Sequence, residues 1–163
     1  KAAGKKTCGE KETLIVPNKI HLTVATVVER SGEFLMVKET KDGRQVINQP
    51  AGHVEPGEDI LAAAVRETLE ETGWNVSLTG FLGISTSFAE ATGITYYRLA
   101  FVAEPVEFDA NAVIDPDIDC ALWMSHQEIQ QNLEHLRSPG VINCLSDYLA
   151  ERIFPMEIFR NTL

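Results

Sequence analysis

Several stretches of the chain carry the apolar and β-branched pattern of strands. Residues 21–29 and 94–102 are the plainest, being rich in Val, Thr, Ile and aromatic side chains that favour pleated, half-buried backbone. Residues 74–88 alternate between apolar and polar, and predict one or two strands with a kink near Gly80 or Gly83. The other predicted strands are 33–39, 45–48, 51–54 and 118–124.

Turn-forming residues separate these strands. Ser31-Gly32 lies between the predicted strands 21–29 and 33–39, so we expect those two strands to pair. Asp42-Gly43 is a strong signal for a type I′ hairpin. Residues 104–117 are acidic and interrupted by proline, and predict a loop, whereas the polar, lysine-rich residues 1–18 predict an arm or a short edge element.

A helix is predicted from about Asp59 to Thr72 because the apolar positions there recur with helical spacing. Gly73 follows at the position where a glycine commonly ends a helix. A helix turns by about 100° per residue. One side of this helix then carries packing residues and the other carries carboxylates. The packing side is Leu61, Val65, Thr68, Leu69 and Thr72, and the carboxylates are Glu67, Glu70 and Glu71.

Two further helices are expected near the C-terminus. One begins at Ser125 with Glu128 three residues later, which forms a capping box, and runs to about residue 131 or 133. Another begins with Ser138 as N-cap and Pro139 as its first residue. Its apolar face extends to Ile153, and the tail from Pro155 is expected to be an extended strap.

The order of these elements predicts the fold class. Strands come first, then a helix, then more strands, then helices. This order is typical of an α/β protein with a mixed sheet and helices on both faces. At 163 residues the chain is most simply one domain, with residues 1–18 as an arm and 19–163 as the folded unit.

Composition excludes several classes of function. The formal net charge is −10, which argues against a nucleic-acid surface built from clustered Lys and Arg. No apolar run approaches the length of a membrane helix, and no apolar segment follows the N-terminal lysines, so we expect neither membrane span nor secretory signal. The three widely spaced cysteines predict free thiols in a reducing cytoplasm, not a zinc site.

The acidic face of the first helix has two interpretations. Glu67 repels Glu70 and Glu71 at helical spacings, each pair costing about 0.2–0.5 kcal/mol, and only Arg66 is close enough to offset this. The face is therefore either a solvated surface or a site for a divalent cation, since Mg²⁺ prefers oxygen ligands and leaves positions for water and phosphate. The glycine-flanked loop before the helix favours the second interpretation. A divalent ion would also reconcile this acidic chain with an anionic substrate.

The same stretch resembles the signature of the Nudix hydrolases, G-x5-E-x7-R-E-U-x-E-E-x-G-U, where U is a bulky aliphatic residue. All the fixed positions are present, and only the two U positions depart, as Thr68 and Trp74. These are packing positions, so the departures leave the chemistry unchanged. The fixed residues are Gly52, Glu58, Arg66, Glu67, Glu70, Glu71 and Gly73.

The resemblance implies the α/β/α sandwich of the Nudix fold and assigns roles to these residues. Glu70 and Glu71 are expected to bind metal, together with the backbone carbonyl of Ala51. Glu67 is either a third ligand or the general base, because family members differ. The resemblance further implies that Mg²⁺ is the cofactor, with Mn²⁺ as the open alternative. Glu58 and Arg66 are expected to orient the carboxylates.

Other residues are candidates for contact with substrate. His53 lies in the loop of the signature, and Asp117 and Asp119 are acids outside it, although loop acids often only solvate a surface. Arg137-Ser138 is either an anion site at a helix start or an ordinary cap. The aromatic residues Trp123, Tyr96 and Tyr97 would either stack on a ring of the substrate or belong to the core.

Beyond the signature, the chain resembles the bacterial NudJ-like phosphatase branch of the family over most of residues 19–158. The segments that carry the resemblance are HLTVATVV, NQPAGHVE, DIDCALW, LRSP and DYLAERIFPMEI. The branch implies a cytoplasmic enzyme, monomeric or homodimeric, that releases orthophosphate from nucleoside tri- and diphosphates and acts on thiamine-related pyrophosphates.

Two other functions stay open. The same chemistry could act on ADP-ribose, dinucleoside polyphosphates or nucleotide sugars, because nothing in the signature separates these substrates. A non-catalytic Nudix-fold binding module is the other alternative, and the complete set of charged residues argues against it. A structural Ca²⁺-binding helix is excluded because no D-x-[DN]-x-[DN]-G loop is present.

Overall fold

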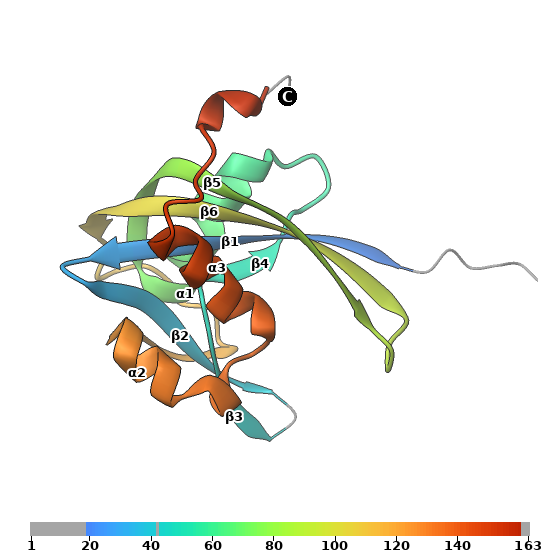
Figure 1. The fold of residues 1–163 in the computed structure, drawn as a ribbon, viewed down its shortest axis with the longest axis horizontal. Coiled ribbons are helices and arrows are strands. Elements are labelled where there is room, and N and C mark those ends of the chain that lie inside the picture. The colour runs from blue at the N-terminus through green and yellow to red at the C-terminus, as the bar shows by residue number, and fades with distance from the viewer. Residues whose placement is uncertain (1–18, 42, 161–163) are drawn as a thin grey trace, which may run out of the picture.

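The computed structural model describes residues 19–41 and 43–160, so the predicted arm over 1–18 and the turn residue Asp42 lie outside the described residues. Within the described part, seven strands form a mixed sheet in the order β3-β2-β1-β6-β5, with β4 on β1 and β7 on β2 (Figure 1). The strands are β1 (Ile20–Arg30), β2 (Glu33–Lys41), β3 (Arg44–Asn48), β4 (Ala51–His53), β5 (Trp74–Ala89), β6 (Ile94–Phe108) and β7 (Ile118–Ser125). The helices are α1 (Ile60–Thr72), α2 (His126–Gln131) and α3 (Pro139–Leu149), with short 3₁₀ turns η1 (Leu133–His135) and η2 (Met156–Ile158).

Strand β1 is the centre of this sheet. It runs parallel to β6 from Ile20↔Thr95 to Val28↔Ala103, and antiparallel to β4 around Val24↔Gly52. Its predicted pairing with β2 is confirmed, but it is confined to the turn, at Glu29↔Phe34 and Arg30↔Glu33. Because β4 and β6 occupy the two edges of β1, strand β2 diverges and pairs with β3 and β7 instead.

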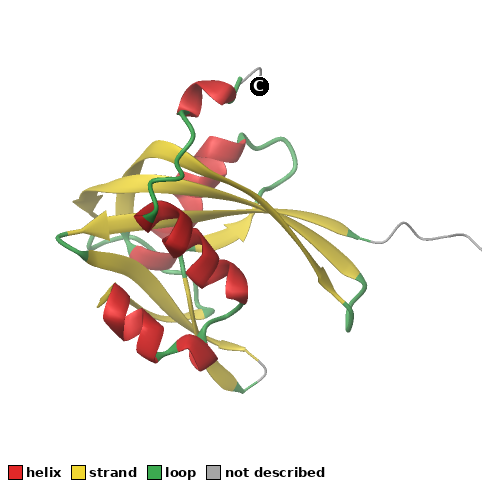
Figure 2. Cartoon of the chain, viewed as in Figure 1, coloured by secondary structure: helices red, strands yellow, loops and turns green. Residues whose placement is uncertain are grey.

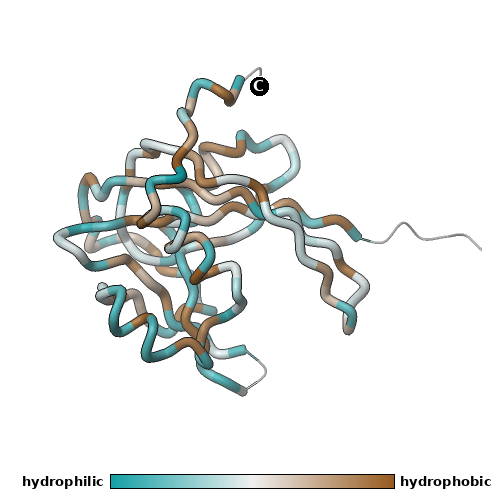
Figure 3. The backbone as a smooth tube through the Cα atoms, viewed as in Figure 1, coloured by the Kyte–Doolittle hydropathy of each residue, from teal (hydrophilic) through white to brown (hydrophobic). Residues whose placement is uncertain are grey.

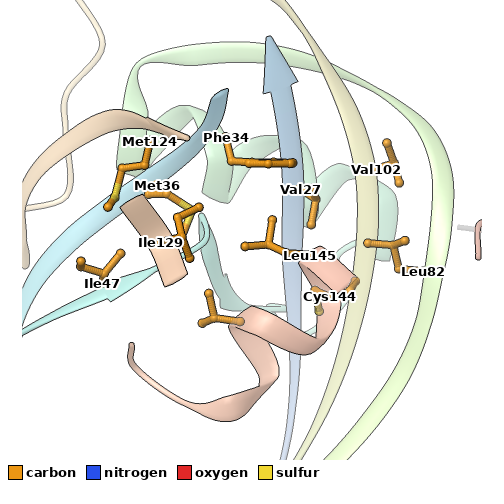
Figure 4. Close-up of a cluster of buried hydrophobic side chains, with 12 residues drawn as sticks. Val27, Phe34, Met36, Ile47, Leu82, Val102, Met124, Ile129, Cys144 and Leu145 are labelled. Carbon is orange, nitrogen blue, oxygen red and sulfur yellow. The ribbon is translucent and has the colours of Figure 1, made fainter. Parts of the chain in front are cut away.

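Helices cover both faces of the sheet, as the order of elements predicts (Figures 1 and 2). On one face, Ala63 and Ala64 of α1 pack with Val24, Phe81 and Phe101. On the other, α2 and α3 contribute to a second cluster, which Figure 4 shows between the strands and α3. Its largest members are Phe34, Met36, Met124, Ile129 and Leu145. This α/β/α layering fixes α1 on a single rigid face of the sheet.

Of the two long strands, β5 matches its predicted range to within one residue, whereas β6 is longer than predicted. The alternation over 74–88 is one continuous strand, whose register with β6 shifts between Leu78 and Gly80 and again between Phe81 and Gly83. Strand β6 continues to Phe108, so the loop predicted over 104–117 is wrong for residues 104–108 and begins only after Phe108. The acidic end of β6 stays extended because it pairs with the start of β5, where Trp74 lies opposite Phe108. Composition alone does not reveal this pairing.

The C-terminal segment also departs from its prediction. Helix α3 ends at Leu149, and Glu151 adopts a φ of 55°, so Ile153 is not on the helix. The backbones of Phe154 and Phe81 exchange hydrogen bonds, which ties this segment to the edge strand β5. The predicted strap beyond Pro155 includes the 3₁₀ turn η2 and is only partly extended.

The distribution of apolar residues follows the layers. In Figure 3 hydrophobic positions run along the central strands, and the tip of the β5–β6 hairpin is hydrophilic. Among the described residues, no helix combines the length and the apolar content needed to cross a membrane. Cys120 and Cys144 are free thiols, as predicted, and Cys8 lies outside the described residues.

Candidate active site

Helix α1 is bounded by two residues that the sequence predicts. The side chain of Asp59 accepts hydrogen bonds from the backbone N–H groups of Leu61 and Ala62, which otherwise lack partners at a helix start. At the other end Gly73 has a φ of 76° and donates its N–H to Leu69 O. Because a side chain at this φ is strained, glycine fixes where the helix ends.

Arg66 lies at the centre of a polar network on α1. Its Nε and Nη2 donate to the two carboxylate oxygens of Glu58, at 2.6 and 2.9 Å. Its Nη1 donates to Glu67 and Glu70, both at 2.9 Å, and Nη2 also donates to the carbonyl oxygen of His53 at 3.0 Å. One guanidinium therefore offsets the repulsion among the carboxylates and fastens the loop before the helix to the helix itself.

Gly52 leaves room for the carboxylate of Glu67. A Cβ atom at position 52 would overlap Cδ and both oxygens of Glu67. Strand β4 thus packs directly against the Glu67 side chain of α1, and glycine at position 52 allows this close approach. Burial raises the pKa of Glu67, while the hydrogen bond from Arg66 acts in the opposite direction.

Glu71 is the most deeply placed carboxylate of the three. Its side chain is buried and accepts the backbone N–H of Ala51 at 2.8 Å. Burial, together with the negative charges of Glu67, Glu39 and Asp115, raises its pKa to about 8, while the hydrogen bond from Ala51 acts in the opposite direction. The predicted division of α1 into a packing side and an acidic side is therefore incomplete, because Glu71 lies within the packed layer.

The donor set of this cluster suits a hard divalent cation. Across residues 19–41 and 43–160, no three acidic, His or Cys side chains already converge at metal-ligand distances. Glu67 and Glu70 are held by Arg66, whereas the buried Glu71 has only a backbone N–H as partner. Carboxylate and backbone carbonyl oxygens are the ligands that Mg²⁺ prefers, and a cation would offset the cost of ionising the buried Glu71.

Comparison with known proteins identifies the family. The family model described as the NUDIX domain matches residues 19–143, which is most of the chain. The chain belongs to the Nudix family. It is 38% identical over 140 residues to the phosphatase NudJ of Escherichia coli, covering 86% of this chain and 90% of that protein.

Solved structures agree with this assignment. A Nudix hydrolase from Nitrosomonas europaea superimposes with a TM-score of 0.84 at 38% identity, covering 88% of this chain and 97% of that one. The MutT protein from Methanosarcina mazei, at 20% identity and a TM-score of 0.63, covers 84% and 98% and shares the fold. The chain is accordingly a Nudix hydrolase, an enzyme that hydrolyses phosphoanhydride bonds.

Both departures from the Nudix signature have local partners. Thr68 is buried, and its hydroxyl donates to Ala64 O at 2.7 Å and lies 2.8 Å from Thr26 Oγ1 on β1. The buried hydroxyl of Thr68 therefore has hydrogen-bond partners, so threonine is accommodated where the signature has an aliphatic residue. Trp74 stacks edge-on against Trp123, with ring centroids 5.7 Å apart, so it fills space between β5 and β7.

His53 belongs to a small aromatic group beside the Nudix signature. Its Nε2 lies 2.9 Å from Nδ1 of His21, and both rings lie near Tyr96. Burial, and secondarily the charge of His21, lowers the pKa of His53. Its contact with substrate stays a prediction, but this arrangement places a neutral, hydrogen-bonding ring on the strand that carries Gly52.

Arg137 and Ser138 precede α3, on the opposite face of the sheet from α1. Ser138 is the N-cap by position, but its side chain makes no capping hydrogen bond. Arg137 Nη1 donates to Glu39 Oε2 at 2.8 Å. Because Glu39 is one of the charges that raise the pKa of Glu71, this arginine is linked to the Nudix helix through a residue the sequence did not single out.

Neither of the two predicted acids has a hydrogen bond to the Nudix helix among the described residues. Asp119 accepts hydrogen bonds from Thr40 and Gln45 on the β2–β3 hairpin. The backbone N–H of Asp117 donates to the side chain of Asp115. Asp115 is the acid that approaches α1, since its own N–H donates to Glu70 O at 2.8 Å. Only the tertiary contact distinguishes it from its neighbours in this acidic loop.

The candidate stacking residues divide into two groups. The Trp123 ring contacts Trp74 and the guanidinium of Arg30, which lies 4.1 Å from its centroid, so its face is occupied by protein. Tyr96 lies by the histidine pair, and Tyr97 is partly exposed on the neighbouring position of β6. The tyrosines therefore remain accessible to a ring, whereas Trp123 packs within the fold.

Proposed function

We propose that this chain hydrolyses nucleoside tri- and diphosphates, and thiamine-related pyrophosphates, with release of orthophosphate and with Mg²⁺ as its cofactor. The observation that carries the proposal is the Arg66 network. The guanidinium of Arg66 holds Glu58, Glu67 and Glu70 together beside the buried Glu71. Similarity to the phosphatase NudJ supports a hydrolase that releases phosphate. We further propose that residues 19–163 act as one cytoplasmic domain, as a monomer or homodimer.

Each residue of the network has a role in this proposal. Glu70 and Glu71, with the carbonyl of Ala51, would hold the ion, for which Mn²⁺ is the alternative. When bound, the ion supplies neutralisation of phosphate charge and a bound water of lowered pKa. Arg66 and Glu58 keep the carboxylates in position.

Glu67 is placed to accept a proton or to serve as a further ligand. Its carboxylate lies between Gly52 and Arg66, and burial raises its pKa. A group whose pKa is raised toward neutrality is suited to accept and then return a proton. Asp115 supplies the additional acid near α1 that was expected of Asp117 or Asp119, and its carboxylate adds negative charge near Glu71.

Substitution of Glu67 tests this assignment. A general base is typically worth about 10²–10⁴ in rate. Glu67→Gln is therefore expected to lower kcat by at least about 10²-fold while far-UV circular dichroism and the melting temperature stay near those of the parent. The exposed Glu134→Gln is the matched control and should retain full kcat. An unchanged kcat for Glu67→Gln contradicts the assignment.

A substrate panel tests the choice of reaction. Orthophosphate is measured after incubation with nucleoside tri- and diphosphates, hydroxymethylpyrimidine pyrophosphate, ADP-ribose, a dinucleoside polyphosphate and a nucleotide sugar. We expect orthophosphate from the first three. ADP-ribose cleaved between its phosphates yields two monophosphates and no orthophosphate. Turnover confined to such capped substrates would replace the proposed function with the alternative Nudix activity.

A further inference from the structure

Arg98 on β6 is a buried cation that makes few contacts. Its Nη2 donates to the amide oxygens of Asn48 and Gln49, at 3.3 and 3.5 Å, which are long for hydrogen bonds to a guanidinium. Its Nε is closed off from solvent and has no partner among the described residues, and the same is true of Nε2 of Gln49. Arg98 on β6 and Gln49, in the connection between β3 and β4, thus each hold an enclosed donor nitrogen. The buried thiol of Cys144, which is only a weak acceptor, interacts with both side chains.

The charge of Arg98 also lacks a direct counter-ion. Three other arginines are paired, Arg66 with Glu58, Arg137 with Glu39 and Arg152 with Asp147, all within 2.8 Å. Arg98 forms no such pair in the described residues, and burial lowers its pKa. Since an isolated buried charge is costly, the surroundings of Arg98 favour the entry of an anion.

The first turn of α3 faces the same guanidinium. A Cβ atom built on Gly140 would lie 3.9 Å from Arg98 Nη1 and 3.3 Å from Ser138 Oγ. Glycine at this position therefore keeps the space between the helix start and Arg98 free of side chain. The backbone N–H of Gly140 and the helix dipole make the start of this 11-residue helix favourable for negative charge, although Pro139 has no N–H and the N–H of Val141 donates to Ser138 O. Ser138, without a capping hydrogen bond, adds an unused hydroxyl.

This position is close to the Nudix site, because Gln49 is two residues before Ala51, whose backbone N–H donates to Glu71 at 2.8 Å. Glu39 pairs with Arg137 and acts electrostatically on both Arg98 and Glu71. Arg98 in turn lies within electrostatic range of Glu71. A substrate whose metal-bound phosphates lie at α1 could therefore extend its end group toward α3.

We propose that Arg98, Gln49 and the first turn of α3 form an oxyanion subsite that holds the terminal phosphate of the substrate, the group that departs. The proposal rests on the proposed function for the identity of that phosphate. Its donors are the N–H groups of Arg98 and Gln49 and the backbone at Gly140. The subsite contributes binding and orientation, and the bond cleavage itself stays with the residues of α1.

Anion binding without metal tests the subsite separately from catalysis. In the presence of a chelator, the unneutralised carboxylates of α1 repel anions, so inorganic phosphate should respond to the donor-rich subsite. We expect saturating phosphate, against chloride of equal ionic strength, to raise the melting temperature of the parent by about 2–4 °C. Arg98→Gln should lose this shift. The matched control Arg152→Gln, which removes a surface arginine paired with Asp147, should keep it.

A second variant separates loss of binding from loss of folding. Gly140→Val leaves Arg98 in place but fills the space before it, and the backbone at this position has no left-handed φ to strain. It should fold and yet show no phosphate shift. Equal phosphate shifts in the parent, Arg98→Gln and Gly140→Val, an adventitious ion only, would overturn the proposal. A response to the neutral nucleoside uridine without one to phosphate would overturn it as well.

Kinetics then links the subsite to the reaction. Losing charge-assisted hydrogen bonds should raise KM for a nucleoside diphosphate about tenfold or more in Arg98→Gln, with a smaller effect on kcat. Orthophosphate should inhibit the parent competitively and the variant weakly. If no nucleotide is hydrolysed but the phosphate shift depends on Arg98, the proposed function fails and the subsite stands. Unchanged KM and unchanged inhibition in the variant reject its role in the reaction.

Discussion

At the scale of single residues, the site depends on the contacts of Arg66 and on the close approach of Gly52 to Glu67. Arg66 alone contacts three carboxylates and the His53 carbonyl, and the hydrogen bonds that it donates to Glu58 are the main reason that its pKa is raised. The repulsion expected between Glu67 and Glu70 is therefore offset within the folded chain, whereas Glu71 has no contact with Arg66 and the charge of Glu67 still raises its pKa. Position 52 is as constrained as the charged positions, because the Glu67 carboxylate lies where its side chain would be.

A methyl group at position 52 tests this constraint. Gly52→Ala should displace the Glu67 carboxylate and lower kcat by at least about tenfold, because small misplacements of catalytic groups are costly. Gly80→Ala is the matched control, since its added methyl would also meet a neighbour, Ile153, but far from α1. Steady-state kinetics and melting temperature are measured for both. Full activity in Gly52→Ala, with folding intact, contradicts the role given to this glycine.

The raised pKa of Glu71 predicts a dependence of stability on pH. Between the ordinary carboxyl pKa near 4.5 and about 8, the unfolded chain releases this proton while folded Glu71 retains it. The free energy of unfolding should therefore fall as pH rises through this window, by up to about 1.4 kcal/mol per pH unit.

Urea titrations of the metal-free protein from pH 5 to pH 8 measure this slope. Glu71→Gln, which keeps an acceptor for the Ala51 N–H, should lose the part of the slope due to this residue and become the more stable protein near pH 8. The exposed Glu134→Gln should follow the parent. Parallel pH profiles for the parent and Glu71→Gln would show that Glu71 is ionised in the fold.

At the scale of elements, α1 is both a packing helix and the carrier of the charged site. Ala63, Ala64 and Thr68 are buried against the sheet, and Glu71 is buried among them while Glu70 reaches solvent. The short strand β4 matters as much, since it positions Gly52 and Ala51 against the helix. The site is therefore formed by two elements whose contact is fixed by the sheet.

A divalent ion should stabilise this pair of elements. Addition of Mg²⁺ is expected to raise the melting temperature by several degrees relative to chelator, because a ligand that binds only the folded state stabilises it. The shift should be greatly reduced in Glu70→Gln and retained in Glu157→Gln, an acid on η2 far from α1 along the chain. Equal melting temperatures with Mg²⁺ and with chelator would argue against a metal site on α1.

At the scale of the whole molecule, the two faces of the sheet carry different parts of the proposed site. The face under α1 carries the Nudix signature, and the face under α3 carries Arg98 and the start of that helix. The C-terminal segment closes the edge of the sheet, where Phe159 packs against Phe81 and Phe101 with ring centroids 4.9 and 5.3 Å apart. The end of the chain thus supports the face on which α1 rests.

Removal of the Phe159 ring tests this support. Phe159→Ala should lower the free energy of unfolding by about 2 kcal/mol, since the ring is partly buried against two others. Phe88→Ala, at an exposed ring near the tip of the β5–β6 hairpin, should change it little. Urea denaturation measures both. Equal stability of the two variants would show that the C-terminal segment does not support the core.

The sequence by itself determined most of the elements and the chemistry of the first helix. Strand alternation, the cap at Asp59 and the stop at Gly73 are local signals, because they depend on neighbours within a few residues. The Nudix signature is local as well, which is why it indicates the family and its α/β/α fold without tertiary information.

Only the tertiary structure decided which distant residues join that helix. The burial of Glu71, the approach of Asp115 and Glu39, and the unpaired charge of Arg98 arise from strands and loops brought together by the sheet. The same holds for β6 continuing to Phe108, because its partner strand β5 keeps an acidic segment extended. Local composition cannot encode these contacts, since each depends on register and layer packing between segments far apart in the chain.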